Sequence, residues 1–550
     1  MLSLARGPAD PFDSRHMSAS PPTGRDRLTL HVLQLGAIAV VLAALPYKAF
    51  DLDRYFVPKE LVLHLCAAIA ALLCIRNRNR VTVTVVDVIL TGFLASSAVS
   101  TLFAINLWAA ERALAISLSG AALFWVASAL RRAGLVRPLL IALACSVVLG
   151  AATSLAQAYG LQTDYFSLNR APGGTFGNRN FVAHLAAIGT PVVMLVALTA
   201  RPGFGSLFGG ISMAVVAAAL VLSRSRAAWL AVIVLAVPVI ILAIRTWNRW
   251  CEPRTLRRVV VLGVFAAAGV GAAVWLPNRL EWKSESPYLD SAVGLVNYKA
   301  GSGKGRLVQY TNSLHMTEAH PVFGVGPGNW AVAYPKYASR GDPSMSQEDG
   351  ITSNPWPSSD WIAYLSERGM LGFALLGMAM FGLLWRTLKD LGVRGGRDAE
   401  RVLTAITLVG TFVAVAVVGA FDAVLLTAVP TFFVWTLAGA LASPGAGGIE
   451  VERGVRRFAP LLVFVLGLVA VGRTALQLAA IVTFSTTSKT GVLERASLFD
   501  PGSYRIHTRL AQSYRVRGDC PRAAAHARAA RRLFPNAAEP RRELAACGAR

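Results

Sequence analysis

Long runs of apolar residues alternate with short polar segments along almost the whole chain. A run of about 20 apolar residues can cross the roughly 30 Å of hydrocarbon in a bilayer, and the hydropathy pattern predicts about thirteen such spans. They are expected at 28–46, 59–75, 83–103, 112–130, 136–158, 181–200, 206–222, 227–245, 258–276, 360–385, 402–421, 423–442 and 458–483. The pattern therefore predicts an all-α polytopic membrane protein with about 12–13 transmembrane helices.

Polar segments divide this array into parts. The first 27 residues are rich in Pro, Ser and Arg without apolar periodicity, which predicts a disordered cytoplasmic tail. One large loop separates the first nine spans from the last four, and a helical tail follows the last span. The expected parts are 1–27, the spans of 28–276, the loop of 277–359, the spans of 360–483 and the tail of 484–550.

The distribution of charge orients the spans. Hydrophobic residues make up 54% of the chain and charged residues 15%, a balance that soluble domains rarely show. Lys and Arg accumulate on the cytoplasmic side of membrane proteins, and alternate connections are indeed basic: 76–80, 131–137, 245–258, 386–401 and 452–457. The N-terminus is then cytoplasmic, and the large loop and the tail lie outside. The net charge of +24 reflects topology and contact with anionic headgroups rather than nucleic-acid binding.

Several arginines lie on the outer side, against this trend: Arg170, Arg179, Arg224, Arg226 and Arg306. A positive charge beside lipid is costly without a partner. The planar guanidinium can bind two oxygens of a diphosphate at once, so these arginines are candidates for one shared anion site. The alternative for each is contact with ordinary phospholipid phosphates at a helix end.

A glycine-rich segment, GGTFGNRNF at 173–181, stands directly before a span and contains Gly177 and Asn180. Irregular backbone is tolerated near lipid only where it is buried in protein or lines a cavity, and glycine lets backbone N–H groups approach an anion closely. The alternative is a plain turn in which Asn178 or Asn180 caps the next helix.

A second such segment, HPVFGVGPGNW at 320–330, lies in the large loop. Its prolines and glycines predict a rigid, irregular scaffold that includes His320, Gly324 and Gly326. It is not a phosphate-binding loop, because no Gly-Lys-Ser/Thr follows. A histidine directly before a proline favours a structural role for His320 over a catalytic one.

Four segments in a fixed order make the chain resemble the O-antigen ligase and polymerase family. They are GTFGNRNFVAHLA, LSRSRAAWLAVIV, GRLVQYTNSLHMTEAHPVFGVGPGNW and SSDWIAYLSERGMLG, and they cover about residues 170–385. The resemblance implies a metal-independent glycosyltransferase without cofactor, which takes its glycan from an undecaprenyl-pyrophosphate donor. It also implies that Arg226 and Arg306 hold the donor diphosphate. Arg224 and Arg179, on the same side of the membrane, are expected to assist.

The chain departs from this family at the candidate base. Members commonly carry a histidine in the stretch leading into the span after the loop, where this chain has Pro357, Ser358 and Ser359. Asp360 is the nearest ionisable replacement, since a half-buried carboxylate can act as a general base. The alternative for Asp360 is an N-cap of the helix that begins there. Glu318, Glu348 and Asp349 are further candidates.

The tail resembles a tetratricopeptide repeat. Pro501 and Pro535 stand 34 residues apart, and between them apolar and small residues fall at matching spacings: Leu510, Ala511, Tyr514, Gly518, Ala523, Ala530 and Leu533. An ordinary helical hairpin is the alternative. In either form the tail is expected to cap the membrane domain or to bind a partner protein. Cys520 and Cys547 fall in neighbouring helices, and outside the cytoplasm they can form a disulfide.

The sequence thus predicts a multi-pass protein of a bacterial inner membrane, with the loop and tail in the periplasm. It would transfer or polymerise a glycan from the lipid-linked donor to a hydroxyl of a sugar, a lipid A core or a protein, in surface polysaccharide biosynthesis. The alternatives are a transporter or flippase of lipid-linked glycans, and a non-catalytic assembly protein of a polysaccharide machinery.

Overall fold

A computed structural model of the chain describes residues 22–50, 52–76, 81–201, 203–282, 284–294, 301–346, 348–393, 398–442, 449–451 and 458–549. Most of the expected N-terminal tail and the basic runs at 77–80 and 452–457 lie outside these residues.

The described residues form an all-α bundle, which confirms the predicted fold class. Ten helices are long and apolar enough to cross a membrane: α2 (Asp53–Arg76), α4 (Leu107–Arg132), α5 (Val136–Ala158), α6 (Arg179–Leu198), α7 (Phe204–Ser223), α8 (Arg226–Arg245), α10 (Pro253–Trp275), α14 (Asp360–Val393), α15 (Ala399–Val418) and α17 (Ala459–Thr486). Helices α1 (Gly24–Leu42), α3 (Val85–Thr101) and α16 (Ala428–Leu441) occupy the other three expected ranges. The chain is therefore a multi-pass membrane protein.

Burial separates central helices from peripheral ones. Every residue of α16 is buried, and this short, predominantly apolar helix packs against α4 and also contacts α2 and α5. Helix α17 instead exposes large apolar side chains such as Leu461, Phe464 and Leu468. A helix that is apolar all round belongs in a core or against lipid, so α16 forms the centre of the bundle and α17 lies at its lipid-facing edge.

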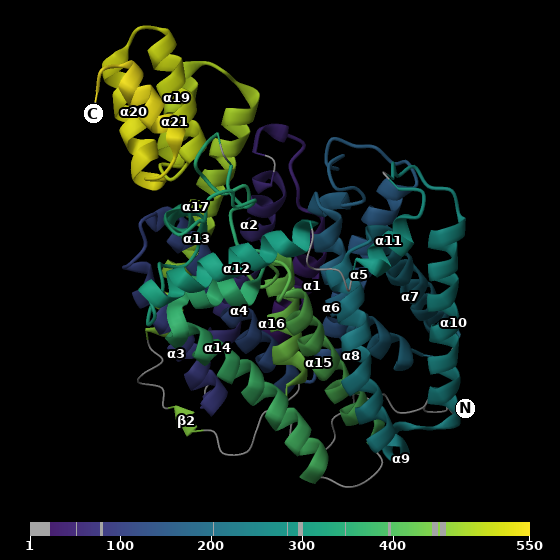
Figure 1. Cartoon of the computed structure of the whole chain (residues 1–550). Helices are drawn as coiled ribbons and strands as arrows, with labels where there is room; N and C mark the ends of the chain where they lie inside the picture. Colours follow the sequence, from purple (N-terminus) through teal and green to yellow (C-terminus); the bar gives the residue numbers. More distant parts are fainter. Residues whose placement is uncertain are drawn as a thin grey trace.

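The shorter elements gather at the two ends of the bundle (Figure 1). Helices α11 (Pro287–Val293), α12 (Gly301–Ala319) and α13 (Trp330–Ala333) lie at the same end as the tail. Helix α9 (Trp247–Trp250) and the strand β2 (Ile449–Val451), which pairs antiparallel with β1 (Val81–Val83), lie at the other. The large loop and the tail thus share one end, opposite the basic connection at 245–258. Which end faces the periplasm stays a prediction.

A break in α14 is bridged by the loop segment 320–330. Gly369 has φ 67° and ψ −177°, so the backbone groups on either side of it cannot complete the helical hydrogen-bond ladder. The loop supplies the missing partners. Val325 N–H donates to the Ser366 carbonyl at 3.0 Å and Gly326 N–H to the Glu367 carbonyl at 2.9 Å, while Met370 N–H donates to the Pro321 carbonyl at 2.8 Å.

The Glu367 carboxylate fastens the rest of this loop. It accepts the N–H of Gly328 at 2.8 Å and the N–H of Trp330 at 3.2 Å. Gly324 has φ 67°, and a Cβ there would overlap with the carbonyls of Ser366 and Glu367. The segment is therefore held to α14 by several backbone hydrogen bonds, and its role as a rigid scaffold stays a prediction.

The tail consists of four helices: α18 (Thr490–Phe499), α19 (Tyr504–Val516), α20 (Cys520–Leu533) and α21 (Ala538–Ala546). The alanines Ala511, Ala523 and Ala530 are fully buried where α19 and α20 pack. The tail contacts the large loop directly, because Ala538 N–H and an Arg542 Nη2–H donate to the carbonyls of Asp349 and Glu348, each at 2.8 Å. The tail lies beside the loop as expected, and its tetratricopeptide assignment stays a prediction.

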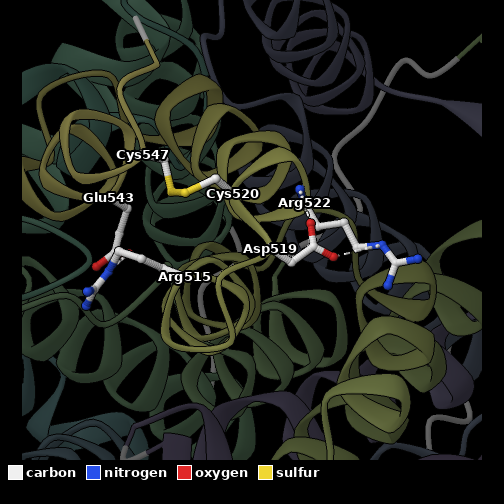
Figure 2. Close-up of a disulfide and its surroundings, with 6 residues drawn as sticks. All are labelled: Arg515, Asp519, Cys520, Arg522, Glu543 and Cys547. Carbon is white, nitrogen blue, oxygen red and sulfur yellow. Dashed lines mark hydrogen bonds and ion pairs between the residues drawn. A yellow bond between two sulfur atoms is a disulfide. The ribbon is translucent and has the colours of Figure 1, made fainter.

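A disulfide between Cys520 and Cys547 closes this tail, as the sequence predicts (Figure 2). Their Cα atoms are 5.3 Å apart, and the bond joins the start of α20 to the residue after α21. Arg515 on α19 forms an ion pair with Glu543 on α21 at 2.7 Å. Helix α21, which carries the contacts to the loop, is thus fastened to both α19 and α20.

We expect Gly369→Ala to lower the stability of the protein by more than about 2 kcal/mol, because the left-handed backbone is strained for alanine and the new Cβ would overlap with the Val322 carbonyl. Gly377→Ala on the same helix is the matched control. A Cβ at Gly377 meets nothing within 4 Å, so that change should be neutral or stabilising. Thermal unfolding of both variants in detergent measures the difference, and equal midpoints would contradict the role of the break.

We expect Cys520→Ser to destabilise the tail by about 2–4 kcal/mol, because the disulfide restricts the unfolded chain. Protease resistance of the tail, with and without reductant, measures this effect. Cys145→Ser is the control, since Cys145 is exposed and unpaired. Protein isolated without reductant and then denatured should show four free thiols out of six cysteines, and six free thiols would count against the bond.

Candidate functional site

Helix α12 runs across the end of the bundle (Figure 1) and is anchored there by Tyr310. The Tyr310 hydroxyl lies within hydrogen-bond distance of the carbonyls of Ser358, at 2.8 Å, and Ala420, at 2.7 Å. Burial raises the pKa of Tyr310 to about 12, so the hydroxyl keeps its proton. These contacts hold α12 over the start of α14 and over the connection between α15 and α16.

Asp360 joins α14 to that same connection. Its carboxylate oxygens accept the N–H groups of Val424 and Leu425, both at 2.8 Å, and its side chain is fully buried. The cap of α14 itself is Ser359, whose hydroxyl accepts the N–H of Ile362 at 3.4 Å. The alternative expected Asp360 to cap its own helix, but its carboxylate instead accepts N–H groups of the connection between α15 and α16. A role of Asp360 as a base stays a prediction.

A cavity lies beside Asp360, among α2, α6, η2 (Gly174–Phe176) and the residues that follow Asp422. Its wall includes Tyr55, Phe56, Lys59, Phe176, Phe181, His184, Ala423 and Val424. Phe176 and Phe181 of the glycine-rich segment line this cavity, and Val424 of its wall donates its N–H to Asp360.

The Lys59 ammonium group in this wall is already satisfied. It donates to the carbonyls of Val41 at 3.3 Å and Thr175 at 2.9 Å, and also to that of Ala43. These carbonyls belong to the end of α1 and to η2. The arrangement indicates that Lys59 ties irregular backbone together beneath the cavity.

His184 was missed by the sequence reasoning. It lies on α6 with 1% of its surface exposed, and its Nε2 is 4.0 Å from a carboxylate oxygen of Asp422. Neither ring nitrogen has a hydrogen-bond partner among the described residues. A signal was present, because His184 follows Asn180 by one helical turn and is an ionisable residue inside an apolar span.

Arg306 on α12 approaches the same place. Its charge interacts electrostatically with both His184 and Tyr310. Its Nε is buried and has no hydrogen-bond partner among the described residues. A guanidinium with an unused Nε donor near a histidine of the cavity wall is suited to binding an anion.

The other outside arginines lie around α11. Arg224 has φ 51°, its guanidinium lies over the Trp282 ring at 4.6 Å, and its Nε donates to the Ser291 hydroxyl at 3.2 Å. Arg226 donates to the Gly294 carbonyl at 2.9 Å. Arg179 lies close enough to Arg224 for their like charges to repel. The convergence of Arg226 with Arg306 on one cavity stays a prediction.

The remaining predicted scaffold residues shape the backbone. Gly177 has φ 71°, and a Cβ there would overlap with the Tyr55 ring, so glycine is required for the close approach. Asn178 caps α6 by accepting the N–H of Asn180 at 3.0 Å, which is the plain-turn alternative. His320 is exposed in the turn after α12, where its carbonyl accepts the Gly324 N–H at 3.1 Å. Within the described residues, no group of three or more His, Cys, Asp or Glu side chains could hold a metal ion.

Residues 211–377 match the family model described as O-Antigen ligase. The resemblance inferred from the sequence is therefore confirmed over this stretch, which contains Arg224, Arg226, Arg306 and Asp360. It does not include the segment that carries His184. A comparison with curated proteins finds no match. The family match supports glycan transfer in surface polysaccharide biosynthesis, from a lipid-linked donor in a membrane.

We expect Asp360→Asn to lower the stability of the protein by about 1–3 kcal/mol, because the new amide group would face one of the two backbone N–H donors and leave it unpaired. Glu318→Gln is the control, since Glu318 is exposed on α12 and the change removes the same charge. Thermal unfolding in detergent compares them. An Asp360→Asn protein as stable as the control would show that the two hydrogen bonds contribute little.

Proposed function

We propose that this protein transfers a glycan from an undecaprenyl-pyrophosphate-linked donor to a hydroxyl group at the periplasmic face of the bacterial inner membrane. The acceptor is a sugar of a growing chain, a lipid A core or a protein side chain. Arg306, with Arg226, Arg224 and Arg179, binds the donor diphosphate. The family match over residues 211–377 supports the reaction class.

One observation supports the placement of the reaction: Arg306 has a buried Nε without a hydrogen-bond partner among the described residues and interacts electrostatically with a histidine of the cavity wall, His184. When the bond between the anomeric carbon and the diphosphate breaks, negative charge grows on the leaving oxygen. A fixed positive group there stabilises this charge more in the transition state than in the bound donor.

The arrangement of elements also suits a lipid-linked donor. Helix α12 and the turn between α7 and α8 belong to the end of the bundle that carries the large loop (Figure 1). A diphosphate at that level of the membrane would place its polyprenyl chain among the apolar spans and its glycan in water. The tail, which contacts the loop through Asp349 and Glu348, provides a surface for a protein partner.

We expect Arg306→Lys to lose nearly as much transfer activity as Arg306→Ala, about 10²–10³-fold, because lysine keeps the charge but loses the two-pronged hydrogen bonding to phosphate oxygens. The assay adds purified protein to membranes from source cells that lack this chain and therefore retain their lipid-linked glycan and acceptor. Mass spectrometry measures glycosylated acceptor and released undecaprenyl pyrophosphate.

Arg340→Lys and Arg340→Ala are matched controls, because Arg340 is an exposed arginine of the same loop. Both should keep full activity. If Arg306→Lys is as active as the wild type, Arg306 acts only as a charge near the lipid surface. If the wild type moves the donor across the membrane without forming glycosylated product, the protein is a transporter and the proposed function is wrong.

A further inference from the structure

The unpartnered imidazole of His184 is the least explained group in the bundle. Its side chain is 1% exposed, it lines the cavity, and both ring nitrogens lack hydrogen-bond partners among the described residues. Buried polar groups are nearly always hydrogen-bonded, and an exception requires an explanation. A group that enters the cavity and bonds to the imidazole would provide one.

His184 has a negative group, Asp422, and a positive group, Arg306, near its imidazole. A general base needs the first, and a negatively charged leaving group needs the second. Asp422 presents a carboxylate oxygen 4.0 Å from Nε2. At this distance the carboxylate is not hydrogen-bonded to the ring, but its charge stabilises the imidazolium that forms. If the two groups approach to hydrogen-bond distance when substrate binds, Asp422 fixes the tautomer and the other nitrogen keeps a lone pair. Arg306 lies on the side of α12, where it can bind an anion. The ionisable groups around the imidazole are Asp422, Arg306 and, in the same cavity wall, Lys59 and Tyr55.

We propose that His184 is the catalytic base of glycan transfer and that Asp422 orients its imidazole. This inference rests on the proposed function. The acceptor hydroxyl oxygen forms a bond to the anomeric carbon of the donor. The bond from that carbon to the diphosphate oxygen breaks, and its electron pair stays on the diphosphate. The hydroxyl proton moves to the free ring nitrogen of His184.

Asp360 is less suited to this step. Both of its oxygens are occupied by backbone N–H groups at 2.8 Å, and the cavity wall does not include it. A proton acceptor needs a lone pair within reach of the substrate, and His184 has one. The competing explanation is that His184 only packs edge-on against Phe181, with ring centres 6.3 Å apart.

The test compares His184→Gln with His64→Gln in the membrane assay described above. His64 is also a buried histidine of the bundle, but it is bonded to the Ser119 hydroxyl at 2.8 Å and lies outside the cavity wall. We expect His184→Gln to lower the rate by about 10²–10⁴-fold and His64→Gln to leave it within a few-fold of the wild type.

The pH profile separates a base from a packing residue. The wild-type rate should hold near neutral pH and fall as the pH is lowered toward about 5, because a protonated imidazole cannot accept the hydroxyl proton. The residual rate of His184→Gln should lack this fall. Added imidazole should partly restore His184→Ala, since that variant leaves space in the cavity. A structural role predicts neither result.

The outcomes are distinct. A wild type that transfers no glycan overturns the proposed function and this role together. An active wild type whose His184→Gln variant keeps its rate overturns the role of His184 alone. If His184→Gln does not insert stably, Asp422→Asn decides instead, because it keeps the imidazole and removes only its orienting carboxylate. It should lower the rate at least about tenfold, and an unchanged rate would overturn the proposal.

Discussion

The hydrogen bonds between the loop at 320–330 and the break in α14 fix the positions of the large loop and of α12 on the bundle. Backbone groups that face lipid without a partner are costly, so a span cannot be interrupted at Gly369 unless other backbone satisfies it. The loop does so through Val325, Gly326 and Met370. In consequence, a segment of the large loop has a fixed position on the bundle, and α12, which precedes it directly, is placed over the start of α14.

The ionisable side chains at this end of the bundle differ in whether their hydrogen-bonding groups have partners. Lys59 and Asp360 have backbone partners that meet their bonding needs, and both tie irregular segments together. His184 and Arg306 retain unused nitrogen atoms although they are buried or half-buried. Buried polar groups are nearly always hydrogen-bonded, so an unused nitrogen beside a cavity is available to a substrate. Other buried groups of the bundle, among them His64 and Arg368, also keep an unused nitrogen, and it is the position of His184 in the cavity wall that distinguishes it from them.

Much of the fold could be predicted from the sequence, because its strongest signals are local. Apolar runs of span length gave the helices, and basic connections such as 245–258 gave an end of the bundle opposite the loop. The Cys520–Cys547 pair followed from helix spacing. The break at Gly369 could not be foreseen, since a glycine in an apolar helix is ordinary and its partners lie more than forty residues earlier in the chain.

The candidate site was harder to predict, because its residues meet only through the packing of distant helices. The arginines could be identified because they fall in segments predicted to lie on the outer side of the membrane, which can be inferred from the order of spans along the chain. His184 and Asp422 lie on separate segments, more than two hundred residues apart, and neither carries a local signal for a pair. The resemblance to the family predicts a histidine near residue 357, where this chain has none. The imidazole of His184 instead reaches the cavity wall from α6, a position that only the packed fold reveals.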